Sequence, residues 1–140
     1  MWCRLNEVRL MGATVLIVED NPQSLELMTY LLGAAGHSVH PAQTGEQALQ
    51  VAEDRDLDLI LLDLQLPDLD GYQVLRALRE GGRYALTKII AVTAVAMVGD
   101  RERTLTAGFD HYVPKPINPR TFVSEIENWL PLRYRNTVPV

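Results

Sequence analysis

Residues 58–71 read Asp-Leu-Ile-Leu-Leu-Asp-Leu-Gln-Leu-Pro-Asp-Leu-Asp-Gly, an apolar run that ends at one carboxylate and a turn. A run of this kind, bounded by turn residues, is typical of a strand that is buried on both faces, as in a parallel sheet. Asp63 follows the run directly, so we expect it at the carboxyl end of a central strand, where open α/β sheets bind their ligands. The stretch therefore predicts an α/β fold with a functional carboxylate at Asp63.

Four more short segments, rich in apolar and β-branched residues, have the character of strands. They lie at residues 14–18, 38–42, 88–92 and 110–113. Apolar residues at helical spacing predict helices from Asn21 to Gly36, from Thr44 to Ala52, from Gly71 to Gly81, from Ala94 to Ala107 and from Asn118 to Leu130. Because strands and helices alternate five times, we expect a doubly wound parallel sheet of strand order 2-1-3-4-5 with helices on both faces.

Local residue pairs mark where three of these helices begin. Asn21-Pro22 and Asn118-Pro119 each combine an N-cap residue with a proline at the first helical position. Thr44 and Gln47 have the spacing of a capping box. These signals predict helices that start directly after Asn21, Thr44 and Asn118.

The composition is that of one ordinary globular domain. The chain has 140 residues, of which 47% are apolar and 22% are charged, and this length is too short for a second core. We place the domain at residues 13–131. Residues 1–12 are expected to be a flexible extension, and residues 132–140 an irregular tail.

Charge and cysteine content argue against several classes of protein. The net charge of −5 and the lack of a Lys/Arg block argue against a nucleic-acid partner. Cys3 is the only cysteine, which excludes an internal disulfide. No apolar stretch reaches the about 18 residues of a membrane helix, and the N-terminus lacks the apolar core of a signal peptide. We therefore expect a cytoplasmic protein without a membrane partner.

Under this topology, polar residues from four strand ends meet at one edge of the sheet. Glu19 and Asp20 follow the first strand, Asp63 follows the third, and Thr93 and Lys115 follow the fourth and fifth. Like charges about 4 Å apart repel by roughly 4 kcal/mol at an effective dielectric near 20, so three ionised acids need a counter-charge. Because hard divalent cations prefer oxygen ligands, and Mg²⁺ binds few carboxylates and keeps waters, we expect Mg²⁺ at this site.

A carboxylate held beside Mg²⁺ and a lysine is equipped to attack phosphorus. The cations neutralise the phosphoryl oxygens, and the carboxylate accepts the group as an aspartyl phosphate. Asp63 stands alone at the end of the middle strand, whereas Glu19 and Asp20 form a pair suited to holding the metal. Asp63 is therefore the predicted nucleophile.

At this point the sequence resembles the receiver domains of two-component response regulators, over residues 14–130. The resemblance rests on five motifs, which are Val-Glu-Asp-Asn-Pro at 18–22, Leu-Asp-Leu-Gln-Leu-Pro at 62–67, Asp-Gly at 70–71, Val-Thr-Ala at 92–94 and Tyr-Val-Pro-Lys-Pro at 112–116. Each motif alone is common, but here all five occur in the right order at strand ends. The resemblance implies a flavodoxin-like fold and a phosphorylation-operated switch.

The resemblance also implies a role for each site residue. Asp63 would be the phosphoacceptor, and Thr93 and Lys115 would contact the phosphoryl group. Tyr112 would be the switch aromatic. The magnesium ligands would be Glu19, Asp20, Asp63 and the backbone carbonyl of Gln65. Glu19 departs from the aspartate that is more common in the family, and we expect its longer side chain to act through a metal-bound water.

A receiver of this kind implies two protein partners. A histidine kinase or phosphotransfer protein would supply the phosphoryl group, and a separate output protein would read the phosphorylated state. The chain after Pro116 has room for one helix and a tail, so we expect a stand-alone receiver that signals by contact. Two finer predictions are a cis bond between Lys115 and Pro116 and a partner surface that includes Met97 and Val98.

Two alternative functions are less consistent with the sequence. A phosphatase of the haloacid-dehalogenase type also forms an aspartyl phosphate, but it needs a second acid two residues after the nucleophile, where this chain has Gln65. A receiver fold used only for docking would be expected to lack some of the acids, Thr93 or Lys115. We predict that the three histidines face solvent and are neither metal ligands nor phosphodonors, namely His37, His40 and His111.

Overall fold

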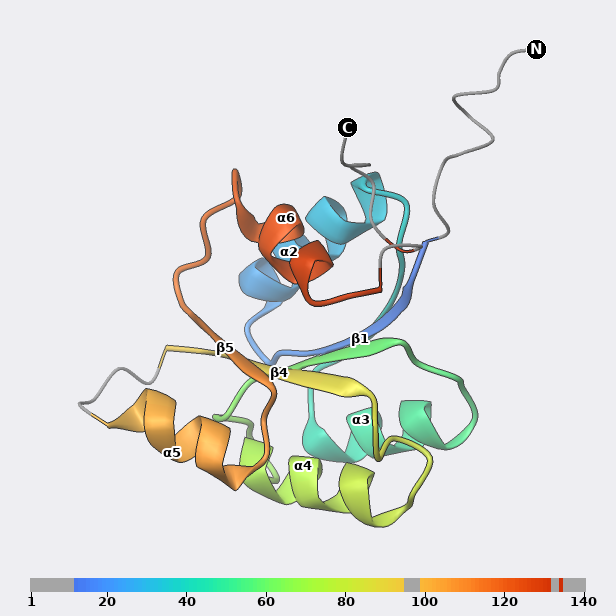
Figure 1. Cartoon of the computed structure of the whole chain (residues 1–140), viewed down its shortest axis with the longest axis vertical. Coiled ribbons are helices and arrows are strands. Elements are labelled where there is room, and N and C mark those ends of the chain that lie inside the picture. Colours follow the sequence, from blue (N-terminus) through green and yellow to red (C-terminus); the bar gives the residue numbers. More distant parts are fainter. Residues whose placement is uncertain (1–11, 95–98, 132–133, 135–140) are drawn as a thin grey trace.

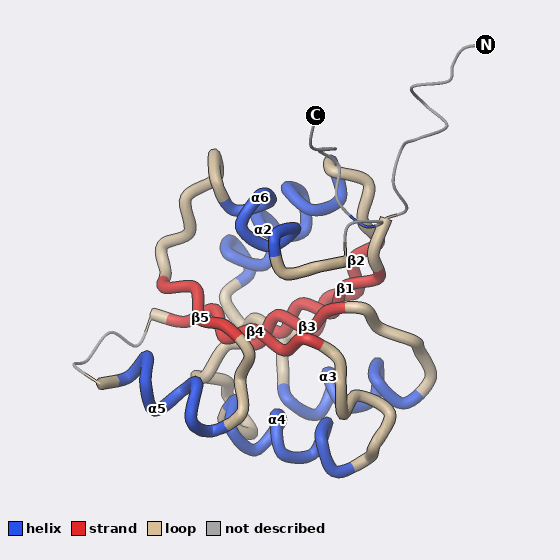
Figure 2. Tube along the Cα trace, in the orientation of Figure 1, coloured by secondary structure: helices blue, strands red, loops and turns tan. Residues whose placement is uncertain are grey.

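A five-stranded parallel sheet forms the centre of the computed structural model, which describes residues 12–94, 99–131 and 134. The strand order is β2-β1-β3-β4-β5, as predicted (Figure 2). The strands are β1 (Thr14–Val18), β2 (Ser38–Ala42), β3 (Leu59–Leu62), β4 (Lys88–Thr93) and β5 (His111–Pro114). Because all four neighbouring pairs are parallel, the carboxyl ends of the strands share one edge of the sheet.

Helices cover both faces of the sheet (Figure 1). One face carries α2 (Pro22–Ala34) and α6 (Phe122–Asn128), and the other carries α3 (Gly45–Glu53), α4 (Gly71–Glu80) and α5 (Asp100–Ala107). In the part of the chain that is described, no helix is both long enough and apolar enough to span a membrane. The result is a three-layer sandwich with an apolar core on each face.

The central strand β3 shows why residues 59–62 are apolar without interruption. Leu59 and Leu61 belong to the core beneath α2 and α6, whereas Ile60 and Leu62 belong to the core beneath α3 and α4. All four side chains are buried. Successive residues of a strand point to opposite faces, so a strand that is covered on both sides has no polar position to offer.

Side-chain caps begin three of the helices. Asn21 Oδ1 accepts hydrogen bonds from two backbone N–H groups in the first turn of α2, as predicted. Thr44 Oγ1 accepts from the Gln47 N–H at 3.0 Å, but Gln47 Oε1 accepts from Gln43 instead of Thr44, so the predicted capping box is displaced by one residue. The complete capping box is the one that Asp70 forms at the start of α4.

Two helices begin later than the sequence predicts. Ala94 is not helical, residues 95–98 lie outside the described part, and α5 begins at Asp100. The Asn118-Pro119 signal forms a turn rather than the first turn of α6, because the Asn118 carbonyl accepts from the N–H groups of Thr121 and Phe122. The helix itself begins at Phe122, a fully buried core residue.

The prediction that His37 faces solvent is wrong. His37 is 5% exposed, and its Nε2 lies 2.8 Å from Oε2 of the buried Glu127 on α6. Its Nδ1 accepts from the Ala13 N–H at 2.9 Å, so the ring donates from Nε2 to the carboxylate. His40 and His111 are half-buried, and the His111 ring stacks on Trp129 with centroids 4.2 Å apart. His37 thus joins α6 to the beginning of β1.

We expect Glu127→Ala to lower the free energy of unfolding by about 1–3 kcal/mol, the usual cost of an unsatisfied buried hydrogen-bond donor. The substitution leaves the His37 Nε2–H without this acceptor in a buried position. Urea unfolding followed by circular dichroism measures the change. Glu125→Ala is the matched control because Glu125 is an exposed glutamate of the same helix, and it should change stability by less than about 0.5 kcal/mol. Equal effects of the two substitutions would contradict the role given to the pair.

Candidate functional site

Strand register brings three acids together at the carboxyl edge of the sheet. Val18 of β1 pairs with Leu62 of β3, so the next residues, Glu19 and Asp63, end neighbouring strands. Ligand oxygens of Glu19, Asp20 and Asp63 all lie within 4.8 Å of one another. Glu19 and Asp63 are buried, whereas Asp20 is exposed. The three carboxylates thus converge as predicted, and Glu19, Asp20 and Asp63 form an acidic cluster.

Lys115 supplies a positive charge to this acidic cluster from the loop after β5. Its Nζ lies 2.8 Å from Asp63 Oδ2 and also contacts Oε1 of Glu19. Burial alone would lower the pKa of Lys115, but the two carboxylates outweigh burial and raise the pKa above its ordinary value. Lys115 is therefore a fixed cation between two acids.

Glu19 uses both carboxylate oxygens within the protein. Oε1 contacts the Lys115 ammonium, and Oε2 accepts from the Asn21 N–H at 3.0 Å. Burial raises the pKa of Glu19, although the Lys115 and Asn21 contacts oppose this shift. The sequence predicts Asn21 as a cap, but no signal in it predicts the backbone contact with Glu19. Asn21 thus begins α2 with its side chain and orients Glu19 with its N–H.

The loop after Asp63 is held close to the strand it leaves. Asp63 Oδ1 accepts from the Gln65 N–H at 3.1 Å, and the Gly71 N–H donates to the Leu64 carbonyl at 2.9 Å. A Cβ on Gly71 would lie 2.6 Å from the Asp63 carbonyl oxygen, so only glycine fits there. Asp68 fastens the same loop to α3 by accepting from two N–H groups of its first turn.

Thr93 lies on β4, the strand beside β3, and Tyr112 lies on β5, the edge strand beyond it. Thr93 is the last residue of β4 and is fully buried, and its carbonyl accepts from the Lys115 N–H at 2.9 Å. Tyr112 on β5 is half-buried and packs against the core on the side of α3 to α5. Burial raises the pKa of Tyr112, and Asp100 and Tyr72 add to the shift. The phenol therefore lies near α4 and α5.

The peptide bond between Lys115 and Pro116 is cis, as predicted from the sequence. It occurs directly after β5, within the segment that carries the lysine. Among the described residues it is the only cis bond. Met97 and Val98, the predicted partner-binding positions, lie outside the described residues.

The site combines a buried carboxylate, Asp63, with the positive charge of Lys115 and with further carboxylate oxygens that could bind a metal ion. Asp63 contacts a lysine, and two further carboxylates lie close enough to share a cation with it. Such a cluster of oxygen donors suits a hard divalent metal rather than a soft one. The arrangement can bind a metal ion and a phosphoryl group next to a carboxylate.

Comparisons with known proteins agree on one family. The model of the response regulator receiver domain matches residues 15–127. The polar-differentiation response regulator DivK of Brucella ovis is 38% identical over 120 residues, which cover 86% of this chain and 98% of that protein. Among solved structures, the receiver domain of the sensor histidine kinase PA1611 from Pseudomonas aeruginosa is 37% identical with a TM-score of 0.77, and the match covers 84% of this chain and 97% of that one. Its active-site cleft coordinates a magnesium ion.

A second solved structure shows the same fold. The chemotaxis response regulator CheY4 of Vibrio cholerae is 26% identical to this chain, with a TM-score of 0.79. The match covers 84% of this chain and 98% of that one. The flavodoxin-like strand order predicted from the sequence is confirmed.

Proposed function

Because the chain belongs to the family of response regulator receiver domains and is a phosphoacceptor of two-component signalling, we propose that Asp63 is the residue that accepts the phosphoryl group. The observation that carries this proposal is the contact between Lys115 Nζ and Asp63 Oδ2 at 2.8 Å, within reach of two further acids. A lysine placed there neutralises the phosphoryl oxygens as they approach the carboxylate.

In the proposed reaction, an Asp63 oxygen attacks phosphorus and forms a new O–P bond. The bond from phosphorus to the donor nitrogen or oxygen breaks, and the donor keeps the electron pair. Asp63 needs no general base because it reacts as a carboxylate. Lys115 holds its proton throughout and moves from pairing with Asp63 to pairing with the transferred group. The Thr93 hydroxyl donates a hydrogen bond to a phosphoryl oxygen.

The acidic cluster fits Mg²⁺ as the cofactor. Asp20 and Asp63 would bind the ion, Glu19 would act through a bound water, and the Gln65 carbonyl would complete the protein ligands. Support comes from the oxygens within 4.8 Å of one another and from the exposure of Asp20, which gives an ion access to the cluster. When bound, the metal neutralises phosphoryl charge.

We expect labelling of Asp63 by acetyl phosphate to require Mg²⁺. In EDTA the rate should fall by roughly 10- to 150-fold, since a lost charge-assisted interaction contributes about 1.5–3 kcal/mol. Calorimetry should also show weaker Mg²⁺ binding in Asp20→Asn. Glu26→Gln, an exposed acid on α2 outside the acidic cluster, is the control and should bind Mg²⁺ as the wild type does. Unchanged labelling in EDTA would refute the metal requirement.

The proposed partners follow from this chemistry. A histidine kinase or a phosphotransfer protein donates the phosphoryl group, and a separate protein reads the phosphorylated surface. A dehalogenase-type phosphatase is not favoured, since Gln65 stands where its second acid is needed and its N–H donates to Asp63. A role in docking alone is not favoured either, because the chain keeps all the residues that a docking module would be expected to lack in part, namely the three acids, Thr93 and Lys115.

A further inference from the structure

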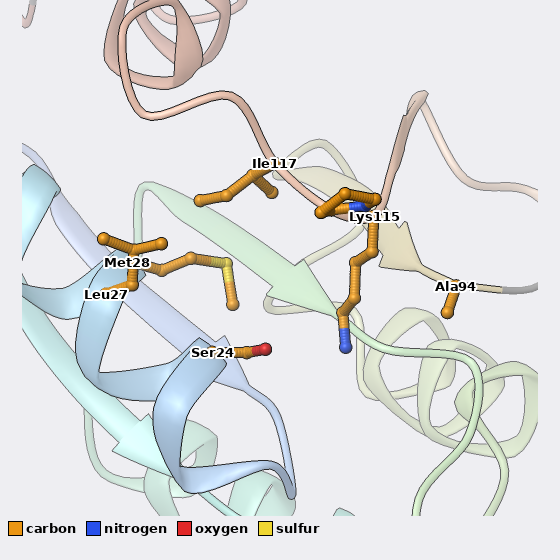
Figure 3. Close-up of a pocket in the computed structure, with 7 residues that line it drawn as sticks. Ser24, Leu27, Met28, Ala94, Lys115 and Ile117 are labelled. Carbon is orange, nitrogen blue, oxygen red and sulfur yellow. The ribbon is translucent and has the colours of Figure 1, made fainter.

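A cavity of about 350 Å³ lies beside the acidic cluster, and of its lining residues only Lys115 has a part in the function proposed above. Its walls come from three segments that are distant in sequence, namely α2, the loop after β5 and Ala94 directly after β4 (Figure 3). From α2 it is lined by Ser24, Leu27 and Met28, and from the loop by Lys115, Pro116 and Ile117. Apart from Ser24 and the lysine ammonium, these walls are apolar.

Lys115 belongs both to this cavity and to the acidic cluster. Its aliphatic stem lines the cavity, whereas its Nζ lies 2.8 Å from Asp63 Oδ2. In Figure 3 the side chains of Ser24 and Lys115 point toward the same space from opposite sides. A molecule that presents a phosphoryl group to Asp63 therefore has an apolar recess directly beside its reacting end.

We propose that this cavity receives the acyl chain of an acyl phosphate that phosphorylates Asp63. The inference rests on the proposed function, because it assumes that Asp63 is the phosphoacceptor. In the step, an Asp63 oxygen forms a bond to phosphorus, and the bond between phosphorus and the acyl oxygen breaks. The released carboxylate takes the electron pair, and no proton moves.

The match between donor and cavity is one of charge and polarity. An acyl phosphate has an anionic head, which Lys115 can pair with, and an apolar tail of a few carbons. The cavity volume is several times the roughly 30 Å³ that one water molecule occupies in the liquid, so a short chain fits. Moving one methylene from water to an apolar wall is favourable by about 0.8 kcal/mol. If the transition state gains this free energy in full, each methylene raises the rate constant by up to about fourfold.

The test uses acetyl, propionyl and butyryl phosphate as phosphodonors. Their leaving carboxylates have nearly equal basicity, so the three differ in chain length rather than in chemical reactivity. Mass spectrometry of the intact protein with Mg²⁺ follows labelling at sub-saturating donor, and each rate is divided by the rate of the donor with hydroxylamine. The normalised rate should rise with each methylene in the wild type, by up to about fourfold.

Substitutions of two equally exposed leucines distinguish an effect of the cavity lining from the effect of removing any surface leucine. Leu27 lines the cavity, and Leu105 lies on α5 on the opposite face of the sheet, and each is 36% exposed. Leu27→Ala should flatten the rise with chain length, whereas Leu105→Ala should keep it. Equal rates for the three donors in the wild type would overturn the inference, as would an equal rise in the two variants. An absence of labelling with every donor would instead overturn the proposed function together with the inference.

Discussion

Asp63→Asn is expected to abolish phosphorylation by acetyl phosphate in the presence of Mg²⁺. The amide that replaces the carboxylate is neutral and is a far weaker nucleophile toward phosphorus. The substitution also removes one of the three acids that could share a cation. Of the two carboxylates that Lys115 contacts in the described part of the chain, only Glu19 then remains. Intact-protein mass spectrometry should therefore show the phosphoryl mass increase in the wild type and none in the variant.

Measuring the stability of Asp63→Asn separates the loss of the phosphoacceptor from a failure to fold. Asn has nearly the shape of Asp and can still accept the hydrogen bond from the Gln65 N–H, so the variant should unfold cooperatively in urea. Asp56→Asn is the matched control, because Asp56 is an exposed aspartate shortly before the same strand, and it should be labelled fully. Full labelling of Asp63→Asn would show that another residue accepts the phosphoryl group.

The second large effect is expected from Thr93→Ala, which should accept phosphate at Asp63 and lose most of the conformational response. A phosphoryl group adds about −1.5 to −2 charges and several strong acceptors near Thr93 and Lys115. Hydrogen bonds to charged groups contribute roughly 1.5–3 kcal/mol each, or about 3–6 for two. Because moving an equilibrium from 1:99 to 99:1 takes about 5.5 kcal/mol, one contact alone leaves a mixed population.

The response is expected to pass through Tyr112 to the surface formed by α5, β5 and α6. Inward motion of the Thr93 hydroxyl vacates space beside β4, and Tyr112 on the neighbouring strand packs on the same side as α5. Hydrogen exchange of residues 99–114 before and after phosphorylation measures this motion directly. The exchange change should be large in the wild type and much reduced in Thr93→Ala.

Thr93→Ser serves as the control, because it keeps the hydroxyl and loses only a methyl group. It should restore the exchange change, since a structural effect of the smaller side chain would persist in both variants. If Thr93→Ala were labelled at Asp63 and still showed the full exchange change, the proposed coupling through Thr93 would be wrong while the phosphorylation site stood.

Features encoded by local sequence could be predicted, above all the strand order and the convergence of the acids. The run at 59–62 identifies a strand covered on both faces, and parallel register then places Glu19 beside Asp63 without further information. The cap at Asn21 and the cis bond before Pro116 are also local features, and both are confirmed. The residue roles at the site remain predictions for the experiments above.

Features that depend on contacts between distant segments could not be predicted. The partner of His37 is Glu127, 90 residues away, and no spacing in the sequence connects the two. The cavity beside Lys115 likewise arises only when α2, the loop after β5 and the end of β4 at Ala94 are packed together. At Asn118 the local signal is real, but it caps a turn, because the packing of Phe122 in the core fixes where α6 begins.

The two aspartates that flank β3 divide the molecule into a reacting end and an anchoring end. Asp58 accepts from the Thr14 N–H at 2.8 Å and from the Tyr134 hydroxyl at 3.1 Å, whereas Asp63 lies at the other end of the four-residue strand, roughly 15 Å away. A fluorophore or an affinity handle attached near Tyr134 would thus stand on the edge remote from the chemistry. Such a label could report on the protein during phosphotransfer without obstructing an incoming donor, which makes this edge the natural place to build a biosensor.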